Sequence, residues 1–180
     1  MQKETGMIAP KMLDAMNEHL NVEFYSAYYY LGMSAHFHDA DLNGFGSWMR
    51  LQFQEELAHA DKFFEFINDR EGIIDLKLID APPKKWDSPL DVFQKALAHE
   101  QMVTQKIYDL VDLSLEIRDH ATNTFLRWFV TEQVEEEFTA SEIIQQLKLV
   151  GNDGNGLFLM DRELGQRRPN RAVESRQSVE

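Results

Sequence analysis

The chain has 180 residues, 43% of them hydrophobic, which suits one domain with a sizeable core. It has no cysteine, so disulfides and thiolate metal sites are excluded, and without a leader or a run of about 18 apolar residues we expect a cytoplasmic protein with no membrane span. The formal net charge of −13 excludes nucleic acid and anionic membranes as natural partners and favours cations.

Proline and glycine divide the chain into four long segments with helical periodicity. These segments span residues 10–38, 43–71, 89–118 and 121–150. Ser88 is a predicted N-cap with Pro89 at the first helical position, and Gly151 is a predicted C-cap. The stretch "GLFLMDREL" predicts a short fifth helix. We expect one domain over residues 1–165 and a polar, disordered tail over residues 166–180.

The lengths of the connections predict the topology. Short links make the first and second helices antiparallel neighbours, and likewise the third and fourth. The link "GIIDLKLIDAPPKKWDS" can reach about 55 Å when extended, whereas a helix of this length spans about 40 Å. We therefore predict an all-α four-helix bundle with one long crossover. Five apolar residues of the crossover could pack on the bundle as it runs back, namely Ile73, Ile74, Leu76, Leu78 and Ile79.

A glutamate interrupts the apolar stripe of every long helix close to its middle. The four are Glu23, Glu56, Glu100 and Glu136, and His59 follows Glu56 by three residues on the same face. Mid-helix positions meet at one level of a bundle, so these side chains should converge. One such glutamate would be an ordinary solvated residue, but burying four without a counter-charge costs several kcal/mol apiece.

Two divalent cations would balance four converging carboxylates. The stripes contain no lysine or arginine that could do so. Oxygen ligands with one imidazole suit iron, manganese or zinc. The pattern therefore predicts a metal site, with Glu56 able to bridge two ions and His59 a nitrogen ligand to one of them.

Four motifs, "NVEFYSAYYY", "QEELAHADKFFEFI", "HEQMVTQKI" and "FLRWFVTEQVEEE", together resemble the non-haem bacterial ferritins. The resemblance covers roughly residues 8–164 and implies a ferritin-like bundle with a di-iron centre. It implies Glu23, Glu56 and His59 as ligands of the first iron. The second iron would be held by Glu56, Glu100 and Glu136.

The resemblance implies further roles around this pair. Gln133 would lie beside the second iron, and Tyr30 and Trp128 would assist electron transfer, although both could be plain core aromatics. A third iron site would be formed by Glu55, Glu132 and Glu135, for which an acidic solvated face is the alternative.

The sequence differs from two related groups of di-iron proteins, and both differences favour the non-haem ferritins. Symmetric di-iron bundles carry Glu-x-x-His on two helices, but Thr139 follows Glu136 by three, so the two irons should be inequivalent. Haem-binding bacterioferritins usually have methionine after the bridging glutamate, whereas this chain has Leu57. We therefore expect iron and no haem.

The function implied by the resemblance is iron storage and detoxification. Fe²⁺ would be oxidised by O₂ or H₂O₂ and stored as ferric mineral inside a cage of 24 copies. The fifth helix would line fourfold axes, and Glu116, Asp119 and His120 would guide cations near threefold axes. One alternative is a rubrerythrin-type di-iron oxidoreductase without storage. The other is a purely structural bundle whose carboxylates stay protonated or bind zinc passively.

Overall fold

The computed structural model describes residues 7–169, and every regular element within them is a helix, which confirms the predicted all-α class. The helices are α1 (Pro10–Asp39), α2 (Asn43–Asp69), α3 (Pro89–Glu116), α4 (His120–Val150) and α5 (Gly154–Leu164). Their ends lie within two residues of the predicted ends of the four long segments. Of the predicted tail over residues 166–180, residues 170–180 lie outside the described part.

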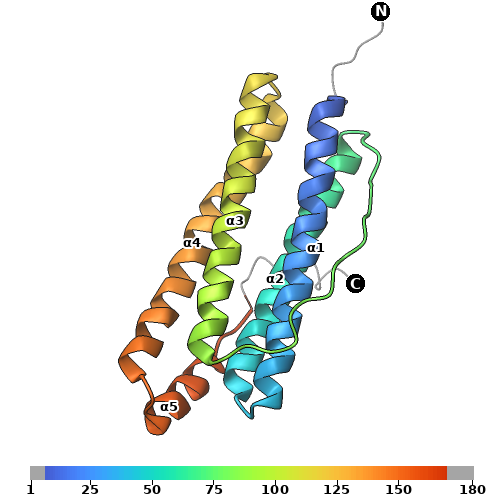
Figure 1. The fold of residues 1–180 in the computed structure, drawn as a ribbon. Helices are drawn as coiled ribbons and strands as arrows, with labels where there is room; N and C mark the ends of the chain where they lie inside the picture. The colour runs from blue at the N-terminus through green and yellow to red at the C-terminus, as the bar shows by residue number, and fades with distance from the viewer. Residues whose placement is uncertain (1–6, 170–180) are drawn as a thin grey trace, which may run out of the picture.

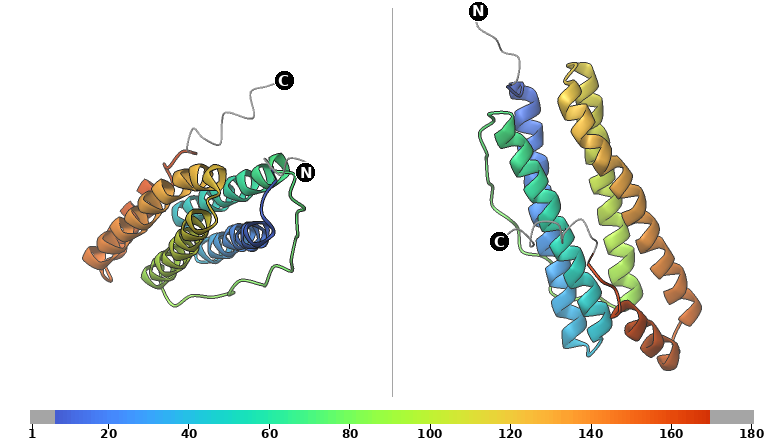
Figure 2. Two further views of the ribbon diagram at one scale, coloured as in Figure 1. Left: turned by 90° about the horizontal axis from the view of Figure 1, so that it is seen from above. Right: turned by 180° about the vertical axis from the view of Figure 1, so that it is seen from behind.

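The four long helices pack side by side as two antiparallel hairpins, α1 with α2 and α3 with α4 (Figure 1). The crossover runs back along the outside of α1, from the end of α2 to the start of α3, as the view along the bundle shows (Figure 2). Helix α5 lies at the end of the bundle where α1 meets α2. The predicted bundle with a single long crossover and a short fifth helix is confirmed.

Two asparagines of α1 hold the crossover. Asn17 donates from Nδ2 to the carbonyl of Ile73 (2.9 Å) and accepts at Oδ1 from the amide of Asp75 (2.9 Å). Asn21, one turn later, makes the same pair of bonds with the carbonyl of Asp75 and the amide of Lys77, each at 2.8 Å.

The expected packing of the crossover's apolar side chains is wrong for four of five. Ile74 packs against the core, but the others are exposed in this chain, namely Ile73, Leu76, Leu78 and Ile79. The asparagines of α1 hold the crossover by its backbone carbonyls and amides, so its attachment does not depend on these side chains.

Side chains cap the starts of α2 and α3, and the one that caps α2 is distant in sequence. Ser88 accepts from the amide of Asp91 at 3.1 Å, as its predicted N-cap role requires. The start of α2 is capped instead by Asp161 of α5, whose Oδ1 accepts from the amides of Gly44 (2.8 Å) and Phe45 (3.0 Å). A Cβ at Gly44 would lie 1.6 Å from the carbonyl oxygen of Asp161, so only glycine permits this approach.

The apolar core is divided into two clusters by a polar layer. One cluster contains Met16 and Phe63, and the other contains Met33 and Phe93. Every long helix passes from one cluster to the other through its glutamate, so the predicted carboxylates occupy the boundary. Within the described residues, no helix is long and apolar enough to cross a membrane.

Candidate metal centre

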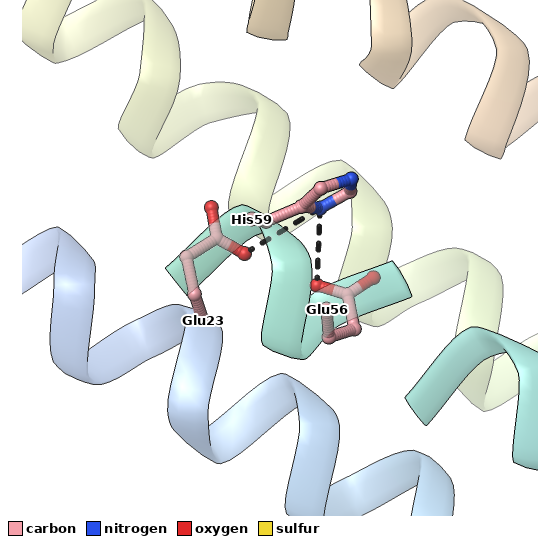
Figure 3. Close-up of side chains that lie close together, drawn as sticks. All are labelled: Glu23, Glu56 and His59. Carbon is pink, nitrogen blue, oxygen red and sulfur yellow. Dashed lines mark ion pairs between the residues drawn. The ribbon is translucent and has the colours of Figure 1, made fainter. Parts of the chain in front are cut away.

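Two helices bring three predicted ligands together in the polar layer. Glu23 comes from α1, while Glu56 and His59 come from adjacent turns of α2 and point toward it (Figure 3). Their potential ligand atoms all lie within 4.8 Å of one another, and all three side chains are buried. His59 Nδ1 is 3.5 Å from Glu56 Oε2 and 3.9 Å from Glu23 Oε2.

Two carboxylate oxygens of this group are available to bind a cation. Glu23 Oε2 and Glu56 Oε1 are buried and have no hydrogen-bond partner among the described residues. Burial raises the pKa of Glu56 well above its usual value, and neighbouring carboxylates raise it further. Burial lowers the pKa of His59, which keeps the imidazole neutral, the form that binds metals.

Glu23 is tied to a residue outside the predicted set. His19 lies one turn earlier on α1, is 3% exposed, and donates from Nε2 to Glu23 Oε1 at 2.8 Å. Burial acts to raise the pKa of Glu23, but the hydrogen bond from His19 and electrostatic attraction by His19 and His59 outweigh it, and the pKa is lowered. A carboxylate kept ionised in this way suits a metal ligand.

Glu100 and Glu136, the other two carboxylates predicted to bind the pair of metals, accept hydrogen bonds from uncharged donors. Glu100 accepts from the Tyr30 hydroxyl, and from Gln133 Nε2 at 3.1 Å. Burial raises the pKa of Glu100 to about 7, although these two hydrogen bonds oppose the rise. Glu136 accepts from Gln52 Nε2 at 2.8 Å, and burial with nearby carboxylates raises its pKa to about 8.

Glu100 and Glu136 therefore lie in the same polar layer, but they are not part of the close group formed by Glu23, Glu56 and His59. Among the described residues, only Glu23, Glu56 and His59 form a group of ligand atoms as close as 4.8 Å. The charges of Glu100 and Glu136 nevertheless reach Glu56, because both contribute to its raised pKa.

The three residues predicted for a further iron lie at the side of this layer. Glu55 is 5% exposed, Glu132 is half-buried and Glu135 is exposed. Burial raises the pKa of Glu132, and the carboxylates of Glu135 and Glu55 add to the rise, so the three form one negative region. Arg167 reaches this region and donates to Glu55 Oε2 at 2.7 Å.

The predicted aromatic residues differ in their surroundings. Tyr30 is 1% exposed and touches Glu100 directly. Trp128 is 37% exposed, and its ring lies edge-on to that of His59 with 5.4 Å between the ring centroids. The ammonium nitrogen of Lys62 lies 4.6 Å from the centroid of the Trp128 ring, over its face.

Two of the predicted cation guides are engaged elsewhere in this chain. Asp119 caps α4 through the amide of Thr122 at 3.1 Å and pairs with Arg70 at 3.1 Å. Glu116 pairs with Lys11 at 3.1 Å.

Sequence reasoning gave no role to three residues that touch the site. His19 could have been found from its spacing of four before Glu23, and Gln52 from its place as an amide in the apolar stripe of α2. Arg167 lies in the segment after α5, and no periodicity links it to α2.

Comparison with known proteins gives one consistent family. The family model described as "Ferritin-like domain" matches residues 13–150. The bacterial non-heme ferritin of Bacteroides fragilis (strain 638R) is 41% identical over 161 residues, covering 89% of this chain and 100% of that one. The bacterial non-heme ferritin of Staphylococcus haemolyticus is 38% identical over the same length, with 89% and 97% covered. The open-pore ferritin of the hyperthermophilic archaeon Archaeoglobus fulgidus superposes with a TM-score of 0.89 at 45% identity, covering 89% and 98%.

Proposed function

This chain belongs to the ferritin family, and we propose that it stores iron after oxidising Fe²⁺ at a pair of sites inside each four-helix bundle. The observation that carries the proposal is the buried group of Glu23, Glu56 and His59. It leaves two carboxylate oxygens without hydrogen-bond partners next to a neutral imidazole. Unpaired buried carboxylates are costly unless a cation binds them.

The first Fe²⁺ would be bound by Glu23, Glu56 and His59. The second would be bound by Glu56, Glu100 and Glu136, the last two of which are held by Tyr30, Gln133 and Gln52. Protons leave Glu56, Glu100 and Glu136 when cations bind, since burial favours their neutral forms in the metal-free protein.

The reaction balances with two irons per oxidant. Each Fe²⁺ gives up one electron, and O₂ takes two electrons and two protons to become H₂O₂. With H₂O₂ as oxidant, the same two electrons and two protons cleave the O–O bond and give two waters. The chain's own part is to hold both metals in one dry layer and to exchange protons through its buried carboxyls. Tyr30 and Trp128 lie close enough to the centre to assist electron transfer.

Storage requires a hollow assembly, because one bundle encloses no store. We propose a hollow cage of 24 copies in the cytoplasm, supported by the likeness to ferritin structures. We further propose that the protein carries no haem, since Leu57 offers no axial sulfur beside the centre. None of the similarities described above favours the rubrerythrin-type alternative.

The deciding experiment mixes metal-free protein, loaded anaerobically with two Fe²⁺ per subunit, with O₂, and sizes the assembly in parallel. We expect a rapid oxidative burst that consumes one O₂ per two Fe²⁺. Glu56→Ala should abolish the rapid phase, whereas Tyr30→Phe should slow it less because Tyr30 only hydrogen-bonds a ligand. A burst at the parent rate in Glu56→Ala, or a small oligomer, would contradict the proposal.

We propose that Glu55, Glu132 and Glu135 bind a third iron that is not needed for the first burst. Glu55→Ala and Glu132→Ala should therefore leave that burst largely intact. The iron-to-oxygen ratio or the regeneration of a second burst should change instead, as followed by stopped-flow absorbance over repeated Fe²⁺ additions. Loss of the first burst would place these residues in the central pair, and no change in either phase would leave them as a solvated face.

A further inference from the structure

The positively charged side chain of Arg167 reaches the negative region formed by Glu55, Glu132 and Glu135. The segment after α5 turns back toward the middle of α2 (Figure 2), held by backbone bonds such as that from the amide of Arg167 to the carbonyl of Leu164 at 3.2 Å. This brings the guanidinium of Arg167 to Glu55 Oε2 at 2.7 Å. The pair is largely shielded, with 24% of the Arg167 side chain and 7% of the Glu55 side chain exposed.

Two further contacts fix the position of this guanidinium. It stacks over the ring of Trp48 at 4.6 Å, and it donates to Gln52 Oε1. An arginine can only donate hydrogen bonds, so the oxygen of the Gln52 amide must face it. The amide nitrogen of Gln52 therefore faces Glu136, to which it donates at 2.8 Å.

Arg167 and a third iron would compete for the same carboxylate. Glu55 is the most buried of the three proposed ligands of that iron, while Glu132 and Glu135 come from α4 and have no contact with Arg167 among the described residues. A guanidinium and a divalent cation at one buried carboxylate would repel each other strongly. Among the described residues, neither Glu23 nor His59 forms a hydrogen bond or ion pair with Arg167, so the first iron has no such competitor.

We propose that Arg167 is the resident counter-ion of the third iron site and sets its affinity, because a third cation must displace the guanidinium from Glu55. This inference rests on the proposed function, since it assumes a third site next to a central pair. It assigns the segment after α5 a direct part in iron handling. The exchange breaks the ion pair between Arg167 and Glu55, but no covalent bond is broken and no electron moves, because one cation replaces another at Glu55.

The test is a calorimetric titration of the assembled, metal-free cage with Fe²⁺ under anaerobic conditions, and with Co²⁺ as a cation that does not turn over. In Arg167→Gln, the third and weakest binding step should tighten by about tenfold, the scale of one charge-assisted hydrogen bond. The step assigned to Glu23, Glu56 and His59 should stay within about twofold of the parent, whereas the second step can change because Arg167 orients Gln52, which donates to Glu136. Arg168→Gln removes the same charge at the exposed neighbouring position and should leave all three steps unchanged.

Trp48 gives a second readout that does not depend on oxidation. The third equivalent of Zn²⁺ should change tryptophan emission in the parent as the guanidinium leaves the ring. Trp48→Phe and Arg167→Gln should both lack this change. Because Zn²⁺ is redox-inert, the signal reports displacement alone.

The outcomes separate this inference from the function on which it rests. A parent cage that binds no pair of cations per subunit overturns both. A parent with two tight sites but an unaltered third step in Arg167→Gln overturns the inference alone, as does an equal effect of Arg168→Gln, which would indicate general charge. Gel filtration and thermal unfolding of each variant show whether the cage is intact, and Arg167→Lys, which keeps the charge without the planar fork, should fall between parent and Arg167→Gln.

Discussion

At the scale of single residues, the polar layer depends on side chains that hold the ligands as well as on the ligands. Glu23 is fixed by His19, Glu100 by Tyr30 and Gln133, and Glu136 by Gln52. Each of these partners is itself buried, so its hydrogen bond is not shared with bulk water. The carboxylates are therefore oriented before a metal arrives, which reduces the reorganisation that binding requires.

His19 should be a positioning residue for the first metal. His19→Leu removes the donor to Glu23 Oε1 and should weaken binding of the first divalent cation by about 10- to 100-fold, the usual range for such partners. His19→Gln can still donate a hydrogen bond and should restore most of the affinity. Anaerobic titration with Co²⁺ measures both variants, and parent-like affinity in His19→Leu would rule this role out.

At the scale of elements, most of the bundle follows from the sequence. Helical periodicity, Ser88, Pro89 and Gly151 are local signals, and the structure places helix ends close to where they predict. The level at which the four glutamates meet also follows, because it depends only on helix length and link length. The contacts of Asp161 and Arg167 with α2 could not be predicted, since they span 117 and more than 110 residues and no repeat marks them.

Gly44 should be essential for the docking of α5 on α2. Gly44→Ala puts a methyl group where the backbone oxygen of Asp161 lies, so α5 must shift and the cap on α2 must weaken. We expect a loss of about 1–3 kcal/mol in unfolding free energy, as for other overpacked sites. Gly154→Ala is the matched control, because nothing lies within 4 Å of its added Cβ. Thermal unfolding of the metal-free proteins compares them, and equal midpoints would contradict this account of Gly44.

At the scale of the whole molecule, charge and metal binding are coupled. The formal net charge of −13 counts every carboxyl as ionised, but burial raises the pKa of Glu100 to about 7 and that of Glu136 to about 8. Raising the pH ionises these groups in a dry layer, where they repel one another. Cations relieve the same repulsion, so the stability of the fold and the loading of its centre should respond to pH in opposite ways.

The metal-free protein should lose stability as the pH rises from about 5 to 8. The folded pKa values of Glu100 and Glu136 are raised to about 7 and about 8, whereas their unfolded values stay near 4.5. The folded state therefore binds more protons, and the stabilisation present below the unfolded pKa is lost as the pH passes the folded values. Between pH 5.5 and 8 these shifts correspond to a loss of about 5 kcal/mol, or roughly 10–20 °C in melting temperature.

Scanning calorimetry at pH 5.5 and 8 measures this loss. The double variant Glu100→Gln, Glu136→Gln should show a much weaker dependence, and Co²⁺ at pH 8 should restore the parent's melting temperature. A melting temperature that is constant or rises over this range in the metal-free parent would refute the coupling.

The cap that Asp161 places on α2 has a consequence for the order in which the chain folds. Contacts within each helical hairpin are close in sequence, and such contacts form early. The amide of Gly44 at the start of α2 must wait for a carboxylate 117 residues further along, which is synthesised after all four long helices. A bundle can therefore pair its four long helices while the first turn of α2 still frays. Docking of α5 is then the closing event of folding, and it brings Arg167 to the centre in the same step.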